Sequence, residues 1–243
     1  MSMSLITRII KKEQFNPGVI GIFTNPFYFS RRGLFHAMTD LGKELSGNLL
    51  DIGCGTKPYE PYLSVRKYIG VEIDTERSRT TSKADLFYDG NKLPFAAHEF
   101  DSVLANEVFE HVFNPSGFLT EINRVLKIDG KFLLTVPFVW DEHEQPHDYA
   151  RYTSFGLRHI LELHGFEVVR HKKSVTNAAV IFQLIAEFIY KKTYVNNVFL
   201  RQMLNVLLIS PVTIIGIIIS AVLPTNEDLY LDNIMLAKKV KDV

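Results

Sequence analysis

The sequence predicts an α/β fold in which helices cover both faces of a mostly parallel sheet. Three observations carry this prediction. Short apolar runs alternate along the chain with amphipathic helical segments, which is the pattern of a parallel sheet. The first apolar run passes directly into a glycine-rich turn, within residues 48–56. The next run, about twenty residues farther on, ends in an acidic stretch that contains Glu72, as strands that bind nucleotides do.

The glycine turn is the segment around which the rest of the sequence is interpreted. It reads N-L-L-D-I-G-C-G-T, so Asp51 lies near the end of the strand and Gly53 and Gly55 follow it. In open α/β sheets, ligands bind beyond the carboxyl ends of the strands, where glycine lets the backbone approach them closely. We interpret Cys54, the single cysteine of the chain, as a small residue packed beneath the ligand rather than as a nucleophile, because no base lies near it in sequence.

The acidic end of the second strand indicates which ligand the turn binds. A carboxylate at Glu72 can accept hydrogen bonds from both hydroxyls of a ribose. A dinucleotide fingerprint, G-x-G-x-x-G, would need glycine at position 58, where the chain has Pro58 and therefore lacks an amide donor. The D-x-G-x-G motif followed by this acid instead resembles the first motifs of the class I S-adenosylmethionine-dependent methyltransferases, of the type 11-like kind.

The resemblance implies a Rossmann-like, seven-stranded sheet with an antiparallel last strand, and S-adenosyl-L-methionine as the cofactor. Asp89 begins the run D-x-x-x-L-P-F, which resembles the segment whose aspartate contacts the adenine amino group, and Asp85 is the alternative. The loop after the strand at 100–105 would flank the methionine part of the cofactor. The implied cofactor-binding residues are Asp51, Gly53, Cys54, Gly55, Glu72, Asp89 and Asn106.

The remaining elements continue the alternation of strands and helices. Apolar runs predict strands at 100–105, 131–137, 165–169 and 229–239. Apolar residues at helical spacing predict helices at 30–45 and 115–126, and another that begins at 155. Pro115 near the start of the second helix and Gly130 beyond its end obey the usual asymmetry of helix termini.

The loop at 138–153 carries the largest number of reactive side chains. It follows a strand whose carboxyl end should lie beside the transferable methyl group. A sulfonium needs little activation, so the protein mainly has to align the reactants and remove a proton from the acceptor. A neutral imidazole can take that proton near physiological pH, so His143 and His147 are candidates for the base or for a group that orients the substrate. His111 is a third candidate, with a structural or cofactor-side role as the alternative.

The same loop resembles one found in a methyltransferase subgroup associated with surface-glycan or lipid-linked substrates. This resemblance implies substrate contacts for Asp148, Arg151 and Tyr152. Arg151 suits a phosphate or carboxylate, and an ion pair with Asp148 is the alternative. Residues 143–147 formally match the H-E-x-x-H signature of zinc proteases, but Pro146 disrupts the continuous helix that this signature requires. We therefore predict no metal site.

An apolar segment precedes the predicted last strand. No charged residue occurs between positions 202 and 226, and 203–223 is long enough to span a membrane. If the last strand joins the sheet, a single crossing would leave it on the wrong side, whereas Pro211 and Gly216 permit a bend that returns the chain from one leaflet. We expect monotopic membrane association, favoured by the flanking basic residues. A buried cap, a dimer interface and a true span are the alternatives.

Composition limits the class of protein and its partners. Of the 243 residues, 47% are hydrophobic, which provides for a substantial core. Lys+Arg and Asp+Glu are 27 each, so no net charge indicates a nucleic-acid partner. The N-terminus lacks the apolar core of a signal peptide. We expect a cytoplasmic protein, peripheral on the inner face of the membrane where it associates with one.

The predicted organisation is a helical lead-in, a cofactor-binding core, an apolar insertion and the last strand of the core, at residues 1–47, 48–174, 175–226 and 227–243. The lead-in and the insertion are expected to build the acceptor pocket. The predicted function is methyl transfer to an oxygen or nitrogen of a small acceptor, or of a lipid- or glycan-linked one, in glycan or lipid biosynthesis. The alternative is a membrane-associated binding module that keeps the fold and performs no chemistry.

Overall fold

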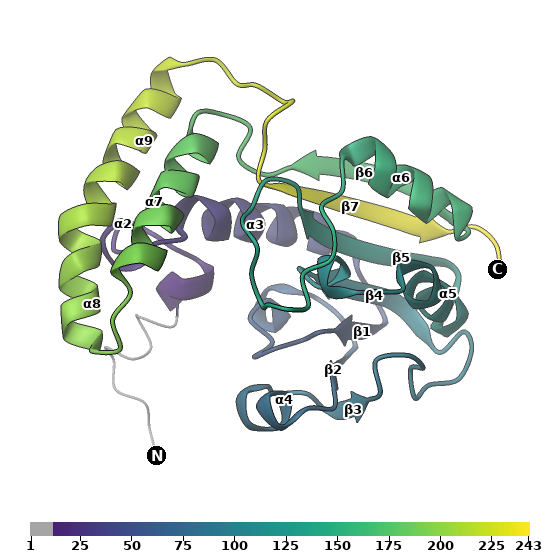
Figure 1. Cartoon of the computed structure of the whole chain (residues 1–243). Coiled ribbons are helices and arrows are strands. Elements are labelled where there is room, and N and C mark those ends of the chain that lie inside the picture. Colours follow the sequence, from purple (N-terminus) through teal and green to yellow (C-terminus); the bar gives the residue numbers. More distant parts are fainter. Residues whose placement is uncertain (1–11) are drawn as a thin grey trace. The chain divides into compact units, whose positions relative to one another are not determined.

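The computed structural model describes residues 12–243 (Figure 1). Seven strands form one sheet in the order β3-β2-β1-β4-β5-β7-β6. The pairs from β3 to β5 are parallel and the last strand is antiparallel, which confirms the predicted fold class. The strands are β1 Asn48–Ile52, β2 Lys67–Ile73, β3 Leu86–Tyr88, β4 Phe100–Asn106, β5 Leu126–Pro137, β6 Phe166–Lys173 and β7 Asp232–Lys239.

The helices alternate with the strands through the core and then follow one another without interruption before β7. The α-helices are α2 Gly21–Thr24, α3 Tyr28–Leu41, α4 Glu76–Thr81, α5 Pro115–Val125, α6 Ser154–Leu163, α7 Ala179–Thr193, α8 Val198–Leu204 and α9 Ser210–Val222. Three short 3₁₀ turns are η1 Gly42–Glu44, η2 Glu60–Tyr62 and η3 Phe109–His111, and a π-helical segment is η4 Asn205–Ile209.

The described chain divides into two compact units, one made of 12–36 and 173–232 and the other of 37–172 and 233–243. The second unit contains nearly all of the sheet and the main core. That core consists of apolar side chains from the central strands and from α5 and α6, among them Leu50, Val103, Leu134, Ile122 and Leu161.

The parallel register brings the carboxyl ends of three strands to one edge of the sheet. Ile52, the last residue of β1, lies opposite Val71 of β2 on one side and opposite Ala105 of β4 on the other. Glu72 and Asn106 come directly after these two partners. The segments that the sequence assigns to the cofactor therefore leave the sheet side by side.

The strand β5 begins earlier than the sequence predicts. Leu126 pairs with Phe100, whereas the regular register with β4 starts only at Lys131. The intervening residues form an irregularity in the ladder. Their sequence, K-I-D-G, is typical of a turn, so the pattern of apolar residues does not predict a strand there.

The other compact unit is organised around α7. Gln183, fully buried on this helix, accepts a hydrogen bond from the backbone N–H of Phe29 at 3.0 Å and donates one to the carbonyl of Pro26 at 3.0 Å. Tyr28, Phe29 and Ala179 form a small apolar cluster around this contact. A buried amide with both ends engaged fixes the start of α3 on α7.

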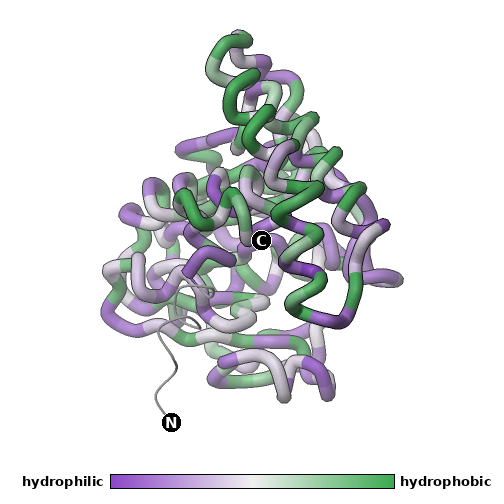
Figure 2. Tube along the Cα trace, turned by 90° about the vertical axis from the view of Figure 1, so that its left-hand side faces the viewer, coloured by the Kyte–Doolittle hydropathy of each residue, from purple (hydrophilic) through white to green (hydrophobic). Residues whose placement is uncertain are grey.

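The apolar segment of this unit is one helical run, Val198–Val222, long and apolar enough to cross a membrane by length and composition. Hydrophobic residues predominate along it (Figure 2). The run continues through Pro211 and Gly216 rather than breaking there. Proline cannot donate to the carbonyl four residues earlier, and the π-helical turn just before Pro211 accommodates this missing bond.

Candidate active site

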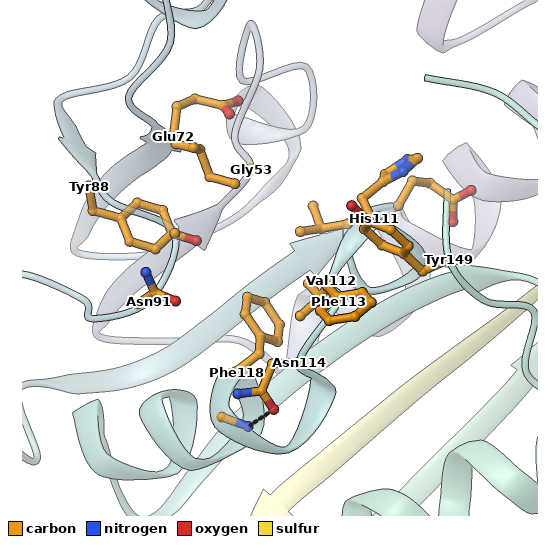
Figure 3. A pocket seen from close by; sticks show the side chains of 15 residues that line it. Gly53, Glu72, Tyr88, Asn91, His111, Val112, Phe113, Asn114, Phe118 and Tyr149 are labelled. Carbon is orange, nitrogen blue, oxygen red and sulfur yellow. Dashed lines mark hydrogen bonds between the residues drawn. The ribbon is translucent and has the colours of Figure 1, made fainter. Parts of the chain in front are cut away.

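A cavity of about 540 Å³ opens beside the carboxyl ends of β1, β2 and β4 (Figure 3). Its volume lies in the range that holds small molecules and cofactors. Three of the predicted site residues, Gly53, Glu72 and His111, line it. Other lining residues include Tyr88, Asn91, Phe113, Phe118 and Tyr149.

The glycine turn forms one wall of the cavity. Gly53 has φ +70°, and a Cβ added there would lie 2.4 Å from the side chain of Val108. Gly55 has φ +50° with open space around the position of a Cβ. Both conformations favour glycine, so the sequence G-C-G is what this turn requires. Its backbone is therefore open to close approach by a ligand.

Glu72 is held at the end of β2 by this turn. Its Oε1 accepts a hydrogen bond from the backbone N–H of Gly55 at 2.6 Å. Burial raises the pKa of the carboxyl, and the Gly55 N–H opposes that shift by favouring the ionised form. A carboxylate fixed in this way at a cavity wall is preorganised to accept hydroxyl donors.

Asp51 and Cys54 lie behind the turn and do not line the cavity. Tyr68 donates a hydrogen bond to Asp51 Oδ2 at 2.5 Å, and burial raises the pKa of Asp51 to about 7. Burial likewise raises the pKa of the Cys54 thiol to about 12, so the thiol stays protonated. These two residues support the turn from beneath, and direct cofactor contacts for them stay a prediction.

The raised pKa of Asp51 predicts a specific dependence of stability on pH. The folded protein holds a proton at Asp51 up to about pH 7, whereas the unfolded chain releases it near 3.8. The folded state therefore binds more protons, and its stability falls as pH rises through this window. Between pH 5 and pH 7, wild type should lose about 2.3 kcal/mol of stability relative to Asp51→Asn. This is about 1.36 kcal/mol for each unit of pH, reduced near pH 7 where the folded protein itself begins to release the proton. Urea unfolding of both proteins at pH 5, 6 and 7 measures this difference, and parallel pH profiles would contradict it.

The structure places Asp89 at a turn beside the cavity. Its Oδ1 accepts hydrogen bonds from the backbone N–H groups of Asn91 and Lys92 at 2.9 and 3.0 Å, which lower its pKa. The alternative, Asp85, pairs with Lys57 at 2.5 Å. Both carboxylates are thus engaged in local structure, and the adenine contact of Asp89 stays a prediction.

Asn106 ends β4 and accepts a hydrogen bond from the Thr135 hydroxyl at 3.1 Å. This contact joins the ends of β4 and β5. The two residues that follow, Glu107 and Val108, line the cavity, whereas Asn106 is not among its lining residues. A cofactor contact for Asn106 also stays a prediction.

His111 and His143 come together although they lie on different loops. Their rings pack edge to face with centroids 4.8 Å apart. Both rings lie near the fully buried carboxylate of Glu110, whose Oε1 is 3.6 Å from His111 Nε2 and 3.8 Å from His143 Nε2. Burial and the neighbouring His143 lower the pKa of His111, against a hydrogen bond to the carbonyl of His147. The neutral imidazole is therefore favoured at His111.

His147 occupies a different place from His143, because residues 141–153 are not helical. Its imidazole is exposed, and the Nδ1 atom of this ring lies 3.0 Å from the hydroxyl of Tyr149. Tyr149 in turn lines the cavity. The two histidines of the loop thus belong to separate groups, one with Glu110 and the other with Tyr149, and the H-E-x-x-H match does not form a helical site.

Asp148 and Arg151 form the ion pair that the sequence leaves as an alternative. Arg151 Nη1 and Nη2 lie 2.5 and 2.6 Å from the two carboxylate oxygens, in a bidentate arrangement. Burial opposes ionisation of Asp148, but the Arg151 guanidinium and the His143 N–H together bring its pKa down to about 2. Tyr152 stacks on Phe109 with ring centroids 5.1 Å apart. These contacts fix the loop, and substrate contacts by the three residues stay a prediction.

Sequence reasoning did not single out several side chains that line the cavity, namely Tyr88, Asn91, Phe113, Phe118 and Tyr149. Asn91 follows Asp89 in the same turn, and Tyr88 ends β3. Because ligands bind beyond the carboxyl ends of strands, the position of these two residues at a strand end and in the turn after it could have identified them as site residues. The aromatic residues supply flat apolar surface of the kind that lines cofactor pockets.

The residues present fit an adenosine-containing cofactor. Gly53 leaves the wall bare of a side chain, and Glu72 presents a fixed acceptor to the same cavity. Tyr88 and Phe118 add aromatic surface. A ribose with two hydroxyl donors and a planar base match this combination of a carboxylate, exposed backbone and aromatic rings.

Residues 50–134 match a protein family described as "Methyltransferase domain". Two uncharacterized proteins of Methanocaldococcus jannaschii are similar over part of the chain. One is 34% identical over 93 residues, which cover 37% of this chain and 44% of that protein. The other is 33% identical over 97 residues, which cover 38% of each. The match thus covers less than half the length of these relatives.

Solved structures share the fold at low sequence identity. Phosphoethanolamine N-methyltransferase 2 of Haemonchus contortus, solved with S-adenosyl-L-methionine, is 17% identical with a TM-score of 0.53, covering 95% of this chain and 59% of that one. The cyclase SpnF is 20% identical with a TM-score of 0.53, covering 83% of this chain and 80% of that one. At such identities the likeness concerns the fold alone.

Proposed function

We propose that this chain, in which residues 50–134 form a methyltransferase domain, transfers a methyl group from S-adenosyl-L-methionine to an oxygen or nitrogen atom of an acceptor. The domain match confirms the predicted class I type and its cofactor. The observation that carries the proposal is the pairing of Glu72 with the Gly55 N–H at the wall of a cavity that the glycine turn also lines.

The residues of the cavity divide the work between holding the cofactor and handling a proton. S-adenosyl-L-methionine supplies a methyl group on a positively charged sulfur. Glu72 would accept hydrogen bonds from the ribose hydroxyls, and the backbone at Gly53 would allow the cofactor to approach closely. Tyr88 and Phe118 add apolar aromatic surface to the cavity, which would limit the access of water to the transferred methyl group.

Proton removal is assigned to His147 acting through Tyr149. Tyr149 lines the cavity, and its hydroxyl lies 3.0 Å from His147 Nδ1. In the tautomer that carries its proton on Nε2, His147 accepts the hydroxyl proton of Tyr149 while the hydroxyl oxygen takes the proton of the acceptor. We choose His147 over His143 and His111 because it contacts the hydroxyl of Tyr149, a residue that lines the cavity, whereas the Nε2 atoms of the other two lie 3.8 and 3.6 Å from Glu110 Oε1.

Two measurements test the proposal. Calorimetric titration of the full chain with S-adenosyl-L-methionine should give saturable binding, and the absence of heat and of a thermal shift at millimolar ligand would contradict it. Release of S-adenosylhomocysteine should then be followed with glycolipid, polyprenyl and small hydroxyl or amine acceptors. Turnover with any of them distinguishes an enzyme from a module that binds the cofactor without chemistry.

We further propose that the acceptor is lipid-linked and reached from a membrane surface. Support comes from the run Val198–Val222, of which the most apolar window is only 28% buried. Phe199, Leu207 and Ile218 along it are all more than half exposed. Lys191 and Lys192 at the end of α7 supply positive charge that favours anionic headgroups.

This membrane proposal predicts the behaviour of charged variants. The triple variant Phe199→Asp, Leu207→Asp, Ile218→Asp should bind vesicles that contain anionic lipid at least tenfold more weakly than wild type, because burying a large apolar side chain contributes about 1.5–3 kcal/mol. Phe155→Asp, at an equally exposed phenylalanine of α6, is the matched control. Flotation with liposomes measures the effect. Equal flotation of the triple variant and wild type, or none by wild type, would contradict membrane association.

A further inference from the structure

Three side chains beside the cavity hold atoms that can ligate a metal ion close to one another. Glu110 and His111 belong to the turn η3, and His143 belongs to the loop after β5. One carboxylate oxygen and one imidazole nitrogen from each histidine all lie within 4.8 Å of one another. His111 also lines the cavity (Figure 3), so the cluster adjoins the site of the proposed methyl transfer.

The tautomer of His111 follows from its other nitrogen. Nδ1 lies 2.8 Å from the backbone carbonyl oxygen of His147. A carbonyl only accepts, so Nδ1 carries the hydrogen. In the neutral ring, Nε2 is then an unprotonated nitrogen, and its lone pair lies 3.6 Å from Glu110 Oε1.

The tautomer of His143 follows in the same way. Nδ1 lies 3.2 Å from Asp148 Oδ2 and 3.3 Å from the carbonyl of Asp141, both acceptors. Arg151 Nη2 also lies 3.4 Å from it, and this atom makes shorter hydrogen bonds to Asp148 Oδ2 at 2.6 Å and to the Asp141 carbonyl at 2.9 Å. We therefore assign the hydrogen of the neutral His143 ring to Nδ1, and in this tautomer the lone pair of Nε2 lies 3.8 Å from Glu110 Oε1.

Two nitrogen lone pairs and a carboxylate oxygen thus converge, an arrangement that a cation between them stabilises. We propose that Glu110, His111 and His143 bind a divalent transition-metal ion, with Zn²⁺ as the reference ion. Two histidines and one glutamate are a known ligand set of catalytic zinc, and imidazole selects zinc-like ions over Mg²⁺ and Ca²⁺. Bonds of 2.0–2.2 Å place tetrahedral ligands about 3.4 Å apart. The Glu110 oxygen lies 3.6 and 3.8 Å from the two imidazole nitrogens, and the three ligating atoms all lie within 4.8 Å of one another, so a bound ion would draw them closer together.

The surroundings of the cluster match those of metal sites. Histidine ligands characteristically donate their other N–H to a carboxylate or a backbone carbonyl. The Asp141 carbonyl is placed to accept from His143 Nδ1, with the Asp148 carboxylate 3.2 Å from the same atom, and the His147 carbonyl is placed to accept from His111 Nδ1. Arg151 holds Asp148 in place through the bidentate pair. The loop 138–153 therefore contributes one ligand and the outer contacts of both histidines.

The role of the ion rests on the proposed function. Three protein ligands leave one position of a tetrahedral ion open, and catalytic zinc sites keep such a position for water or substrate. An acceptor oxygen bound there would become more acidic, which would ease transfer of its proton to Tyr149 and from there to His147.

Metal binding is tested on the full chain after treatment with a chelator. Calorimetric titration with ZnCl₂ and absorption titration with CoCl₂ should each show one strong site per chain, with visible bands of four-coordinate cobalt. Glu110→Gln should weaken binding at least tenfold, and the double variant His111→Ala, His143→Ala at least a hundredfold. Asp148→Asn should weaken it ten- to a hundredfold through the outer contact. His159→Ala, an exposed histidine on α6, should bind as wild type does.

The outcomes separate this inference from the proposed function. Absence of a stoichiometric site in wild type, or equal affinity in wild type and Glu110→Gln, would overturn the metal site. Glu110→Gln preserves side-chain shape, so the comparison stands even where the double variant fails to fold. S-adenosyl-L-methionine binding by the same preparations is read independently. Cofactor binding without metal binding overturns only the metal site, and metal binding without cofactor binding overturns only the proposed function.

Discussion

Replacement of His147 by alanine is expected to slow methyl transfer by a factor of about 10² to 10⁴, the usual contribution of a positioned proton acceptor. The reason is the contact of His147 Nδ1 with the Tyr149 hydroxyl at 3.0 Å, which links an exposed imidazole to the cavity. Tyr149→Phe removes the hydroxyl that joins them and should have a similar effect. The measurement is the rate of S-adenosylhomocysteine release at saturating cofactor, with an acceptor from the screen described above.

The comparison needs readouts that separate proton transfer from folding and binding. Cofactor affinity should be unchanged in both variants, because neither side chain is assigned to the cofactor. The deficit should shrink at higher pH, where the acceptor loses its proton without help. His159→Ala provides the control for removal of an imidazole elsewhere on this unit. Undiminished turnover in His147→Ala and Tyr149→Phe would show that the proton leaves by another route.

Replacement of Glu72 by alanine is expected to weaken S-adenosyl-L-methionine binding by about 2 kcal/mol, or roughly thirtyfold, as for loss of hydrogen bonds to a charged group. The carboxylate lines the cavity and is already fixed by the Gly55 N–H at 2.6 Å. Glu72→Gln should lose less, because the amide oxygen still accepts hydrogen bonds. Calorimetric titration of the three proteins gives the affinities directly.

The raised pKa of Glu72 predicts that cofactor affinity depends on pH. Because burial favours the protonated carboxyl, wild-type affinity should increase with pH as the carboxyl ionises. Glu72→Gln should lack this increase. Glu76→Gln, at an exposed acid in the first turn of α4, is the matched control. An affinity that is the same in wild type, Glu72→Ala and Glu72→Gln would remove Glu72 from the cofactor site.

The parts of the fold that can be predicted from the sequence are those that residues close together in the chain determine. The strands β1 and β2 are short apolar runs, and their ends are marked by glycines and an acid within a few residues. The positive φ angles at Gly53 and Gly55 favour glycine, so the glycines in the sequence predict the turn. Pro115 and Gly130 similarly mark the limits of the segment around α5, whose helix ends at Val125.

The features that sequence reasoning missed depend on contacts between distant segments. His143 meets Glu110 and His111 only because the loop after β5 folds onto the turn after β4, and no spacing within either segment encodes that meeting. The early start of β5 at Leu126 is likewise set by its partner Phe100 rather than by its own apolar pattern. Such pairings follow from tertiary structure, which overrides local preference.

The strand order has a consequence for how the chain is made. β7 lies between β5 and β6, and β6 is at the edge of the sheet with β7 as its neighbour. During synthesis β6 therefore emerges well before its partner β7, and the apolar run Val198–Val222 emerges in the interval. Completion of the sheet has to wait for β7, and until then the newly made chain exposes both an unpaired strand and this hydrophobic run. A variant that lacks Asp232–Lys239 would keep β6 without its partner, so loss of this one short strand should be far more damaging than its length suggests.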